Sequence, residues 1–413
     1  MGHSSIPAVR QAGLGSNTAW MLLGLAARFT LQLISFVLLA RSLGAAAFGA
    51  FSGALALSTL LSPVVELGGY SMIVRDLSRG VVARLALGRA LYAMIFNVLP
   101  GLGLLAVIKW LALPTVPWQV ALCVGAAELI GARWLSLVSA VHVGQGTLWR
   151  NAVLEVVSGA TRLLLVVALT ATPSLSLWAW LYLLQSVLIG AAALGWTTMS
   201  SGRPSVGRVD LRERFQEGLH FAVGASAQNA YTDVDKIMLP RLAGLEAVGI
   251  YTGAFRFVVV AFLPLNAFLG ALYPRFFEAG QYGYSAARQV AWRALPITAA
   301  YGLLACTGLW LAAPLLPRLL GPGFGESVQA LRALSVLLLV QSLYFPFADA
   351  LTGSGLQRVR TAGQVGSLIC NIGLNLVLIP RLGWLGAVYS SITTQVMLLF
   401  IWGGYYGVRS PKQ

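Results

Sequence analysis

The sequence predicts an all-α, polytopic integral membrane protein with about twelve transmembrane helices in two six-helix repeats around a central cleft. Of its 413 residues, 58% are hydrophobic and only 10% are charged, against about 25% charged residues in ordinary soluble domains. A membrane-spanning helix needs about 20 predominantly apolar residues, so this composition suffices for about a dozen spans. The apolar runs are too long and too continuous for a β-barrel, whose strands alternate in polarity over about ten residues. A soluble globular protein is therefore excluded.

Twelve apolar runs bounded by charged residues, proline or glycine are predicted to be helices. They cover residues 17–39, 47–70, 88–108, 118–140, 152–171 and 175–198 in the first half, and 218–240, 247–272, 292–316, 328–352, 359–379 and 384–406 in the second. We expect residues 1–199 to form an N-terminal bundle, residues 200–217 a cytoplasmic linker and residues 218–413 a C-terminal bundle. The first run carries Arg28 and Gln32 at its middle and lacks a small-residue cleavage site, so we interpret it as a permanent helix, not a signal peptide.

The distribution of basic residues predicts the orientation in the membrane, because cytoplasmic loops retain Lys and Arg. In the loops, at the chain ends and at the ends of the predicted helices, 17 basic residues fall on one side of the membrane and 5 on the other. Both chain ends lie on the side with the larger number, so both termini are predicted to be cytoplasmic. The formal charge of +15 follows from these loop residues, some of which would touch anionic lipid head groups, and nucleic-acid binding is not expected.

No feature of the sequence indicates a cofactor, a metal site or an enzyme. The lysines are Lys109, Lys236 and Lys412, and the cysteines are Cys123, Cys306 and Cys370. No lysine stands in a Gly-Lys-Ser/Thr setting, so the phosphate-binding loop of ATP-driven pumps is not expected. The cysteines are far apart in apolar surroundings, which favours neither a disulfide nor a zinc site. The predicted loops are all short, which disfavours a membrane-embedded glycosyltransferase or polymerase with a large catalytic loop.

A shift of 200 positions superimposes the two halves of the sequence without a gap. The matching pairs include Arg41 and Arg241, Gly44 and Gly244, Gly49 and Gly249, Gly53 and Gly253, Arg75 and Arg275, and Gly80 and Gly280. An even number of helices in each half makes both copies enter the membrane in the same sense, so the axis between them should run along the membrane normal. Two such bundles would enclose a cleft, as in carriers that work by alternating access.

Several short motifs resemble those of a known transporter family. They are Arg41-Ser42-Leu43-Gly44 with Phe48-Gly49-Ala50-Phe51, Glu66-Leu67-Gly68 with Val74-Arg75-Asp76, Asp235-Lys236-Ile237-Met238-Leu239, Ala247-Val248-Gly249-Ile250-Tyr251-Thr252-Gly253-Ala254-Phe255-Arg256, and Leu272-Tyr273-Pro274-Arg275. These motifs resemble the polysaccharide and O-antigen flippases of the multidrug, oligosaccharidyl-lipid and polysaccharide exporter superfamily. Ala45-Ala46-Ala47 departs from the proline and acidic residues that are usual in that family's first loop.

The resemblance implies a carrier that flips undecaprenyl-pyrophosphate-linked oligosaccharide from the cytoplasmic to the periplasmic leaflet, for O-antigen or exopolysaccharide biosynthesis. It places the protein in the bacterial inner (plasma) membrane, in contact with membrane lipids and functional as a monomer. It leaves open whether the carrier acts alone or beside a polysaccharide polymerase and export machinery. In the related lipid-II flippases, arginines on helices one and eight belong to the substrate site, and Arg28 and Arg256 lie on helices of those ordinals here.

Charges within the predicted spans are the main candidates for function, because a charge at a helix centre costs about 2.5 to 3.5 kcal/mol on insertion scales. Arg28 and Gln32 lie on one helix face, and the guanidinium could bind a pyrophosphate or an acidic sugar. The alternative for Arg28 is a structural pair with a carboxylate, such as Glu66 or Asp349. Arg256 has no acidic residue within one helical turn and therefore needs a partner from another helix or an anionic ligand.

The predicted span 218–240 is the most polar, with Asn229, Asp233 and Lys236 on one face and Asp235 on the adjoining strip. Such a stripe must face a cavity. Asp233 and Lys236 either neutralise one another or contact substrate, and an aspartate without such a partner could bind a coupling proton or sodium ion. Glu66, Asp349, Asp233 and Asp235 are the candidates for ion coupling.

Other intramembrane polar residues leave two interpretations open. Asn371 and Asn375 belong to an uncharged stripe that could bind sugar hydroxyls or join helices. Glu155 and Arg162, seven positions apart, are expected to form ion pairs within their helix or between helices, whereas Glu128 and Arg133 point in different directions and should have different partners.

The competing function is an ion-coupled multidrug antiporter of the same superfamily, which would need an acidic cavity for cationic drugs. The intramembrane basic residues are Arg28, Arg133, Arg162, Lys236, Arg256 and Arg332, and the acidic ones are Glu66, Glu128, Glu155, Asp233, Asp235 and Asp349. Because the two sets balance, the sequence favours the flippase over the antiporter.

Overall fold

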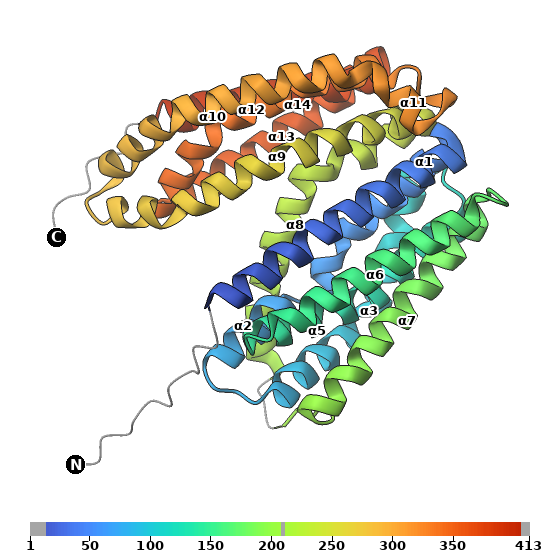
Figure 1. The fold of residues 1–413 in the computed structure, drawn as a ribbon, viewed down its shortest axis with the longest axis vertical. Helices are drawn as coiled ribbons and strands as arrows, with labels where there is room; N and C mark the ends of the chain where they lie inside the picture. Colours follow the sequence, from blue (N-terminus) through green and yellow to red (C-terminus); the bar gives the residue numbers. More distant parts are fainter. Residues whose placement is uncertain (1–13, 208–210, 406–413) are drawn as a thin grey trace.

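The computed structural model describes residues 14–207 and 211–405, and every regular element in these ranges is a helix. Figure 1 shows two groups of helices that meet at one end of the molecule and diverge toward the other. At the end where they meet, α1 passes the short α11, and at the other end α1 begins and α14 finishes. We call these the closed end and the open end. The prediction of an all-α fold is confirmed.

The first group comprises the elements before residue 202. They are α1 (Leu14–Glu66), α2 (Gly69–Ser78), α3 (Ala83–Ala112), α4 (Trp118–Ala126), the π-helical turn η1 (Ala127–Gly131), α5 (Ala132–Gly144), α6 (Leu148–Leu169) and α7 (Leu175–Ser201). Helix α1 packs on α6, α3 and α4. Its backbone breaks at Gly44, where φ is 76° and ψ is 168°, a conformation that glycine adopts without the steric penalty of a Cβ. The break divides α1 into two spans.

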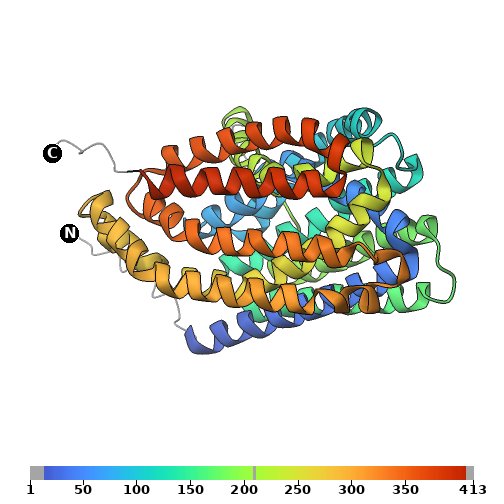
Figure 2. The same cartoon turned by 90° about the horizontal axis from the view of Figure 1, so that it is seen from above.

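The second group follows α8 (Leu211–Leu242). It comprises α9 (Leu245–Gly280), α10 (Tyr284–Ala312), η2 (Ala313–Leu315), α11 (Leu316–Leu320), η3 (Pro322–Phe324), α12 (Ser327–Gly353), α13 (Gln357–Leu382) and α14 (Trp384–Gly403). Helix α12 packs on α9, α10 and α14, and Figure 2 shows the long helices of this group running in nearly the same direction. Helix α8 packs on α1 of the first group and on α13 of the second, so it joins the two groups.

Ten helices in the described residues are long and apolar enough to cross a membrane. One of them is the stretch Ala27–Glu66, which holds two spans because Gly44 interrupts it. Helix α8 has 32 residues, which is long enough for a span, but it is too polar to be counted by composition. Dividing α1 and adding α8 gives the twelve predicted spans.

Several helix boundaries differ from those predicted. Helices α3, α8 and α10 begin at Ala83, Leu211 and Tyr284, five to eight residues earlier than the apolar runs. Their first turns are polar, and a search for apolar runs detects only the part of a helix that lies in lipid. Helix α9 likewise continues to Gly280 through two prolines. The short helix α2 was not predicted, because it is amphipathic and only 10 residues long. The basic residues Arg10, Arg208, Arg409 and Lys412, used above for orientation, lie outside the described residues.

The two halves meet at the closed end through reciprocal contacts. Gly244, with φ 89° and ψ 171°, repeats the backbone conformation of Gly44. A Cβ on Gly49 would collide with the carbonyl oxygen of Leu245, and a Cβ on Gly249 would collide with that of Ala45. Because the contact is the same in both directions, the closed end has the local geometry of a two-fold axis, which is the arrangement of an isologous interface.

Two arginines repeat this exchange. Arg41 Nη1 of the first half donates to the carbonyl oxygen of Arg318 at 3.2 Å. Arg241 Nη1, 200 positions later, donates to the carbonyl oxygen of Leu111 in the first half. Each half therefore bonds with its arginine to the backbone of the other half.

Candidate functional site

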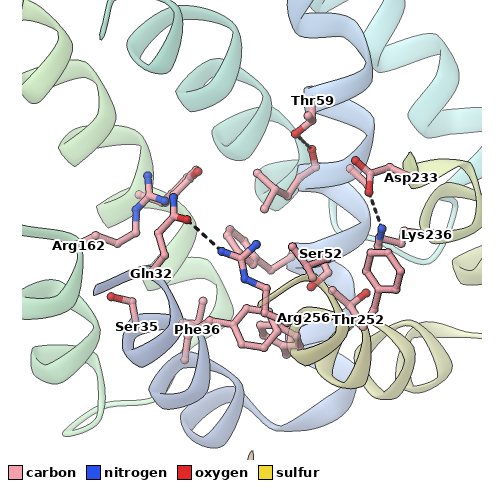
Figure 3. Close-up of a pocket in the computed structure, with 18 of the residues that line it drawn as sticks. Gln32, Ser35, Phe36, Ser52, Thr59, Arg162, Asp233, Lys236, Thr252 and Arg256 are labelled. Carbon is pink, nitrogen blue, oxygen red and sulfur yellow. Dashed lines mark hydrogen bonds and ion pairs between the residues drawn. The ribbon is translucent and has the colours of Figure 1, made fainter. Parts of the chain in front are cut away.

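A cavity of about 530 Å³ lies between α1, η1, α6, α7, α8 and α9. Figure 3 shows its polar side chains turned toward the space between these helices. Aromatic rings form much of the wall, including Phe36, Phe48, Phe51, Trp178 and Phe255. The cavity therefore combines apolar surface with a small number of placed polar groups, which is typical of ligand sites.

The charged side chains that line this cavity are predominantly basic. They are the basic Arg28, Arg162, Lys236 and Arg256, and the acidic Glu128 and Asp233. The formal balance is two positive charges. A cavity of this sign attracts anions and disfavours cations.

Arg28 is paired with a carboxylate, but not with either of the two predicted alternatives. Its Nη1 donates to Glu155 Oε1 of α6 at 3.2 Å. Glu66 instead binds Arg133, with 2.9 Å between Oε2 and Nη1, and Asp349 binds Arg360 at 3.2 Å. The Arg28 side chain remains 43% exposed, so the pair stands at the cavity surface.

Asp233 and Lys236 of α8 form the second ion pair of the cavity, with 2.5 Å between Oδ1 and Nζ. Lys236 Nζ also donates to the Thr232 carbonyl oxygen at 3.1 Å and lies 4.2 Å from the centroid of the Phe255 ring. Asp233 and Lys236 therefore neutralise one another, which is one of the two predicted alternatives, and both residues also line the cavity.

Arg256 of α9 faces the cavity without a carboxylate partner in the described ranges. Its Nη2 donates to Gln32 Oε1 at 3.1 Å, and its guanidinium lies 5.6 Å from the centroid of the Phe36 ring. Gln32 thus belongs to the cavity, as predicted from its position on the face of Arg28. A guanidinium has five donors, so most of the hydrogen-bonding capacity of Arg256 is available to a ligand.

Arg162 of α6 is the second guanidinium of the cavity lining for which the described residues provide no carboxylate partner. It lies over the ring of Tyr182, 4.8 Å from the centroid, and its buried Nε has no hydrogen-bond partner. Figure 3 shows Arg162 and Arg256 turned toward the same region of the cavity from two different helices.

Arg162 was not predicted as a site residue, because the spacing to Glu155 suggested that an ion pair holds this arginine. Glu155 does form an interhelical pair, but with Arg28. Residues seven apart are two helical turns, about 10.5 Å, apart along the axis, which is too far for a direct pair. This separation along the helix axis already indicates, from the sequence alone, that Glu155 cannot neutralise Arg162 directly. By contrast, Glu128 and Arg133 have different partners, as predicted: Glu128 accepts from the Tyr182 hydroxyl, and Arg133 binds Glu66.

Three of the predicted substrate-binding residues lie outside the lining of this cavity. Asn229 Nδ2 donates to the Thr59 carbonyl oxygen at 2.8 Å and so joins α8 to α1. Asn371 donates to Thr394 Oγ1 at 3.4 Å, and Asn375 donates to Asn371 Oδ1 at 2.8 Å. Both are buried. Asn371 joins α13 to α14, which is the second of the two interpretations that the sequence left open, and Asn375 bonds to Asn371 within α13.

Of the four candidates for ion coupling, only Asp233 lines the cavity. Glu66 and Asp349 are held by arginines, as described above. Asp235 is 5% exposed, accepts from the Tyr251 hydroxyl and from its neighbour's backbone N–H, and faces α9. Within the described ranges, no three His, Cys, Asp or Glu side chains gather so that they could hold a metal ion.

Comparison with known proteins supports a transporter fold. A family model described as a polysaccharide biosynthesis protein matches residues 142–279, about a third of the chain. Solved structures of the MOP superfamily match nearly the whole chain. The inward-facing conformation of a multidrug resistance MATE family transporter has 17% identity and a TM-score of 0.69, with 93% of this chain and 97% of that one covered.

Two further structures show the same fold with lower TM-scores. The outward-facing conformation of a MATE family transporter has 16% identity and a TM-score of 0.60, with 93% and 92% of the two chains covered. A MOP superfamily transporter from Pyrococcus furiosus, described as having a binding pocket of reverse polarity that suggests a different function, has 18% identity and a TM-score of 0.61, with 94% and 93% covered. Among curated proteins, no relative matches the chain.

Proposed function

From the premise that this chain is a transporter of the MOP superfamily, we propose that it flips an undecaprenyl-pyrophosphate-linked oligosaccharide from the cytoplasmic to the periplasmic leaflet. The observation that carries the proposal is the pair of guanidinium groups, Arg162 and Arg256, that face the cavity without carboxylate partners in the described residues. A charge inside the bilayer is costly unless it meets water or an opposite charge. Guanidinium matches the geometry of phosphate with two parallel hydrogen bonds, so a pyrophosphate is a suitable ligand.

The shape of the molecule supports movement of substrate from the side of the termini. The chain resembles the inward-facing transporter more than the outward-facing one, with TM-scores of 0.69 and 0.60. The helix groups diverge toward the open end, where α1 begins and α14 finishes. With the termini in the cytoplasm, as the basic loops predict, the cavity faces the cytoplasmic leaflet. An exporter loads its substrate in this state, and alternating access would then open the closed end.

The remaining features of the proposal follow from the same assignment. The carrier would lie in the bacterial inner membrane and act as a monomer in contact with lipids, with its polyprenyl substrate tail in lipid between the halves. The match to a polysaccharide biosynthesis family supports a role in surface polysaccharide assembly. A polymerase or export machinery would receive the product.

An ion-coupled multidrug antiporter is the second candidate, because two of the similar structures are MATE multidrug transporters. The lining of the cavity argues against it. Four basic side chains face two acidic ones, and a cationic drug would meet net repulsion. The fold is compatible with both a flippase and an antiporter, so the similarity in fold does not discriminate between the two functions.

The test is binding and complementation by arginine variants. Arg162→Gln and Arg256→Gln should each weaken binding of undecaprenyl pyrophosphate by about tenfold, since a hydrogen bond to a charged group contributes about 1.5 to 3 kcal/mol. Both should also reduce surface polysaccharide in a strain that lacks the gene. Arg332→Gln is the matched control, because Arg332 lies over Trp310 and outside the cavity lining. Wild-type binding by both cavity variants would refute the assignment.

A further inference from the structure

A second cavity, of about 410 Å³, lies inside the first helix group between α1, α2, η1, α5 and α6. Its walls are mainly polar. They include the hydroxyl groups of Ser136, Ser139 and Ser158, the amide of Asn151 and the carboxylate of Glu155. The first cavity has seven phenylalanine, tyrosine or tryptophan rings in its lining, whereas the second has one, that of Tyr70. The two spaces therefore suit different chemistry.

The two cavities adjoin each other. They share five lining residues, which are Arg28, Gln32, Ser35, Glu128 and Arg162. Arg162, which has no carboxylate partner in the part of the chain that the structure describes, is thus at the junction. A ligand bound to Arg162 through an anionic group can extend into both spaces.

The junction contains unused hydrogen-bonding capacity. Ser35 is 4% exposed, and its Oγ has no hydrogen-bond partner. The buried Nε atoms of Arg28 and Arg162 also have none. Buried polar atoms are nearly always hydrogen-bonded to protein or to water, and leaving one without a partner costs about 1 to 3 kcal/mol. Water or the hydroxyl groups of a ligand would supply these bonds.

Apart from Arg162 at the junction, the charged side chains of the second cavity already have partners. Arg28 binds Glu155 at 3.2 Å, and Arg133 binds Glu66 at 2.9 Å. Ser136 Oγ donates to the same Glu66 carboxylate, and Ser139 Oγ donates to Asn151 Oδ1 at 2.6 Å. Its lining carboxylates already have partners, since Glu155 is bound by Arg28 and Glu128 accepts from the Tyr182 hydroxyl. The space therefore offers neutral donors and acceptors, and it suits a neutral, hydroxyl-rich group better than a free cation.

The order of these surfaces follows the order of groups in a lipid-linked sugar. Apolar walls come first, then the guanidinium groups of Arg256 and Arg162, and then the polar second cavity. We propose that the second cavity binds the sugars next to the pyrophosphate, and that it selects lipids that carry a glycan over the bare polyprenyl pyrophosphate. This inference rests on the proposed function.

The experiment compares three probes on the full-length protein in nanodiscs: undecaprenyl pyrophosphate, and the same lipid carrying one or three hexose units. The wild-type protein should bind the glycosylated lipids about tenfold more tightly than the bare lipid, which corresponds to one or two added hydrogen bonds. Ala132→Phe places a ring in the second cavity, which Ala132 lines. It should remove this tenfold difference and leave binding of the bare lipid unchanged.

Two further variants keep the test independent of folding. Asn151→Ala removes a polar group from the second cavity without filling it and should reduce the preference for glycosylated lipid about threefold. Ala191→Phe, on an exposed face of α7, controls for the added ring and should behave as wild type.

The outcomes separate the inference from the proposed function. If the wild-type protein binds none of the three lipids, the proposed function fails. If it binds all three equally, or if Ala132→Phe weakens binding of the bare lipid as much as that of the glycosylated ones while Ala191→Phe does not, the second cavity is not a sugar site and the inference is overturned. Loss of the glycan preference alone in Ala132→Phe supports it.

Discussion

Gly44 and Gly244 have nearly the same backbone conformation, whereas the helical segments that precede them differ sharply in polarity. Before Gly44, the described side chains of α1 include one intramembrane charge, Arg28, which is paired with the neighbouring α6. Before Gly244, α8 carries Asp233, Asp235 and Lys236 within one turn. The two halves therefore share the same backbone geometry at the closed end, but they differ in the polar side chains that face the cavity.

This difference shows which positions of a duplicated module are free to change. At the closed end, the backbones of the two halves approach so closely that no Cβ fits at Gly49 or Gly249. Close approach of helices through small residues is a common basis of packing in membranes. Side chains that face the cavity have room around them, so each half can acquire different polar groups without disturbing the closed end.

The largest difference between the halves should appear when their ion pairs are broken. Lys236 is 7% exposed at its side chain and Arg28 is 43% exposed. Asp233→Asn leaves a buried charge without its partner and should lower the free energy of unfolding by about 3 kcal/mol. Glu155→Gln, which leaves an exposed arginine, should lower it by about 1 kcal/mol or less. Thermal unfolding in detergent measures both.

Equal losses of stability in these two variants would show that the pairs of the two halves are equivalent. The same proteins sharpen the functional assignment. Each variant removes one negative charge from beside the cavity, so Glu155→Gln should bind undecaprenyl pyrophosphate at least as tightly as wild type. An antiporter for cations would instead bind its drug more tightly when the carboxylate is present.

The helix contact at the closed end, which both halves form, is tested by adding side chains at its glycines. Gly49→Val and Gly249→Val should each destabilise the protein by about 2 to 3 kcal/mol, because the new atoms collide with backbone of the other half. Because the contact is reciprocal, the two losses should be similar. Gly270→Val in α9, where a Cβ would meet nothing within 4 Å, is the control. A large loss in only one of the first two variants would contradict the two-fold geometry.

A smaller effect is expected from the arginines of the closed end. The double variant Arg41→Gln/Arg241→Gln removes the hydrogen bonds to the carbonyl oxygens of Arg318 and Leu111. It should destabilise the closed end by only about 1 kcal/mol, because both arginines are exposed. The population open at that end should then rise about fivefold. Spin labels at Ala46→Cys and Glu246→Cys, exposed positions 200 apart, report the separation.

Arg381→Gln, in the last turn of α13, is a matched control for the loss of a basic residue in the loops of the same side. The two single variants, Arg41→Gln and Arg241→Gln, should shift the distance distribution by similar amounts. No change in the double variant would show that these bonds do not hold the closed end.

The smallest effect is expected in the second half, at Asn375. Its amide donates to Asn371 within α13, and Asn371 in turn donates to Thr394 of α14. Hydrogen bonds between helices contribute about 0.6 kcal/mol on average in a membrane protein. Asn375→Ala should therefore lower the thermal midpoint by about 1 °C and leave binding of lipid-linked sugar unchanged. Loss of binding without loss of stability would restore Asn375 as a substrate-binding residue.

The sequence was sufficient for the features that depend on solvation and on the repeat. Apolar runs predicted the twelve spans, and the shift of 200 positions predicted the relation between Gly44 and Gly244. Arg256 was expected to need a partner from another helix or an anionic ligand, and Gln32 Oε1 of α1 accepts one hydrogen bond from it. Each of these inferences uses only local spacing or the absence of a local partner.

Which carboxylate binds which arginine was not predictable in the same way. Arg28 could reach several acids, and Glu155 was selected by the packing of α1 on α6. Spacing within one helix places residues on a face but does not say which helix that face meets. For the same reason the sequence could not decide whether Asn371 and Asn375 bind sugar hydroxyls or join helices, whereas the structure shows that Asn371 bonds to α14 and Asn375 to Asn371.

The polarity of α8 also has a consequence for how the chain is assembled in the bilayer. An isolated segment with three charges in one turn, among them Asp233 and Lys236, inserts poorly from the translocon, since each such residue opposes insertion. Helix α8 packs along α1 and bonds to it through Asn229. The first half therefore has to be in the membrane before α8 can enter it, and a gene fragment that encodes only the second half should yield a protein that is degraded unless the first half is co-expressed.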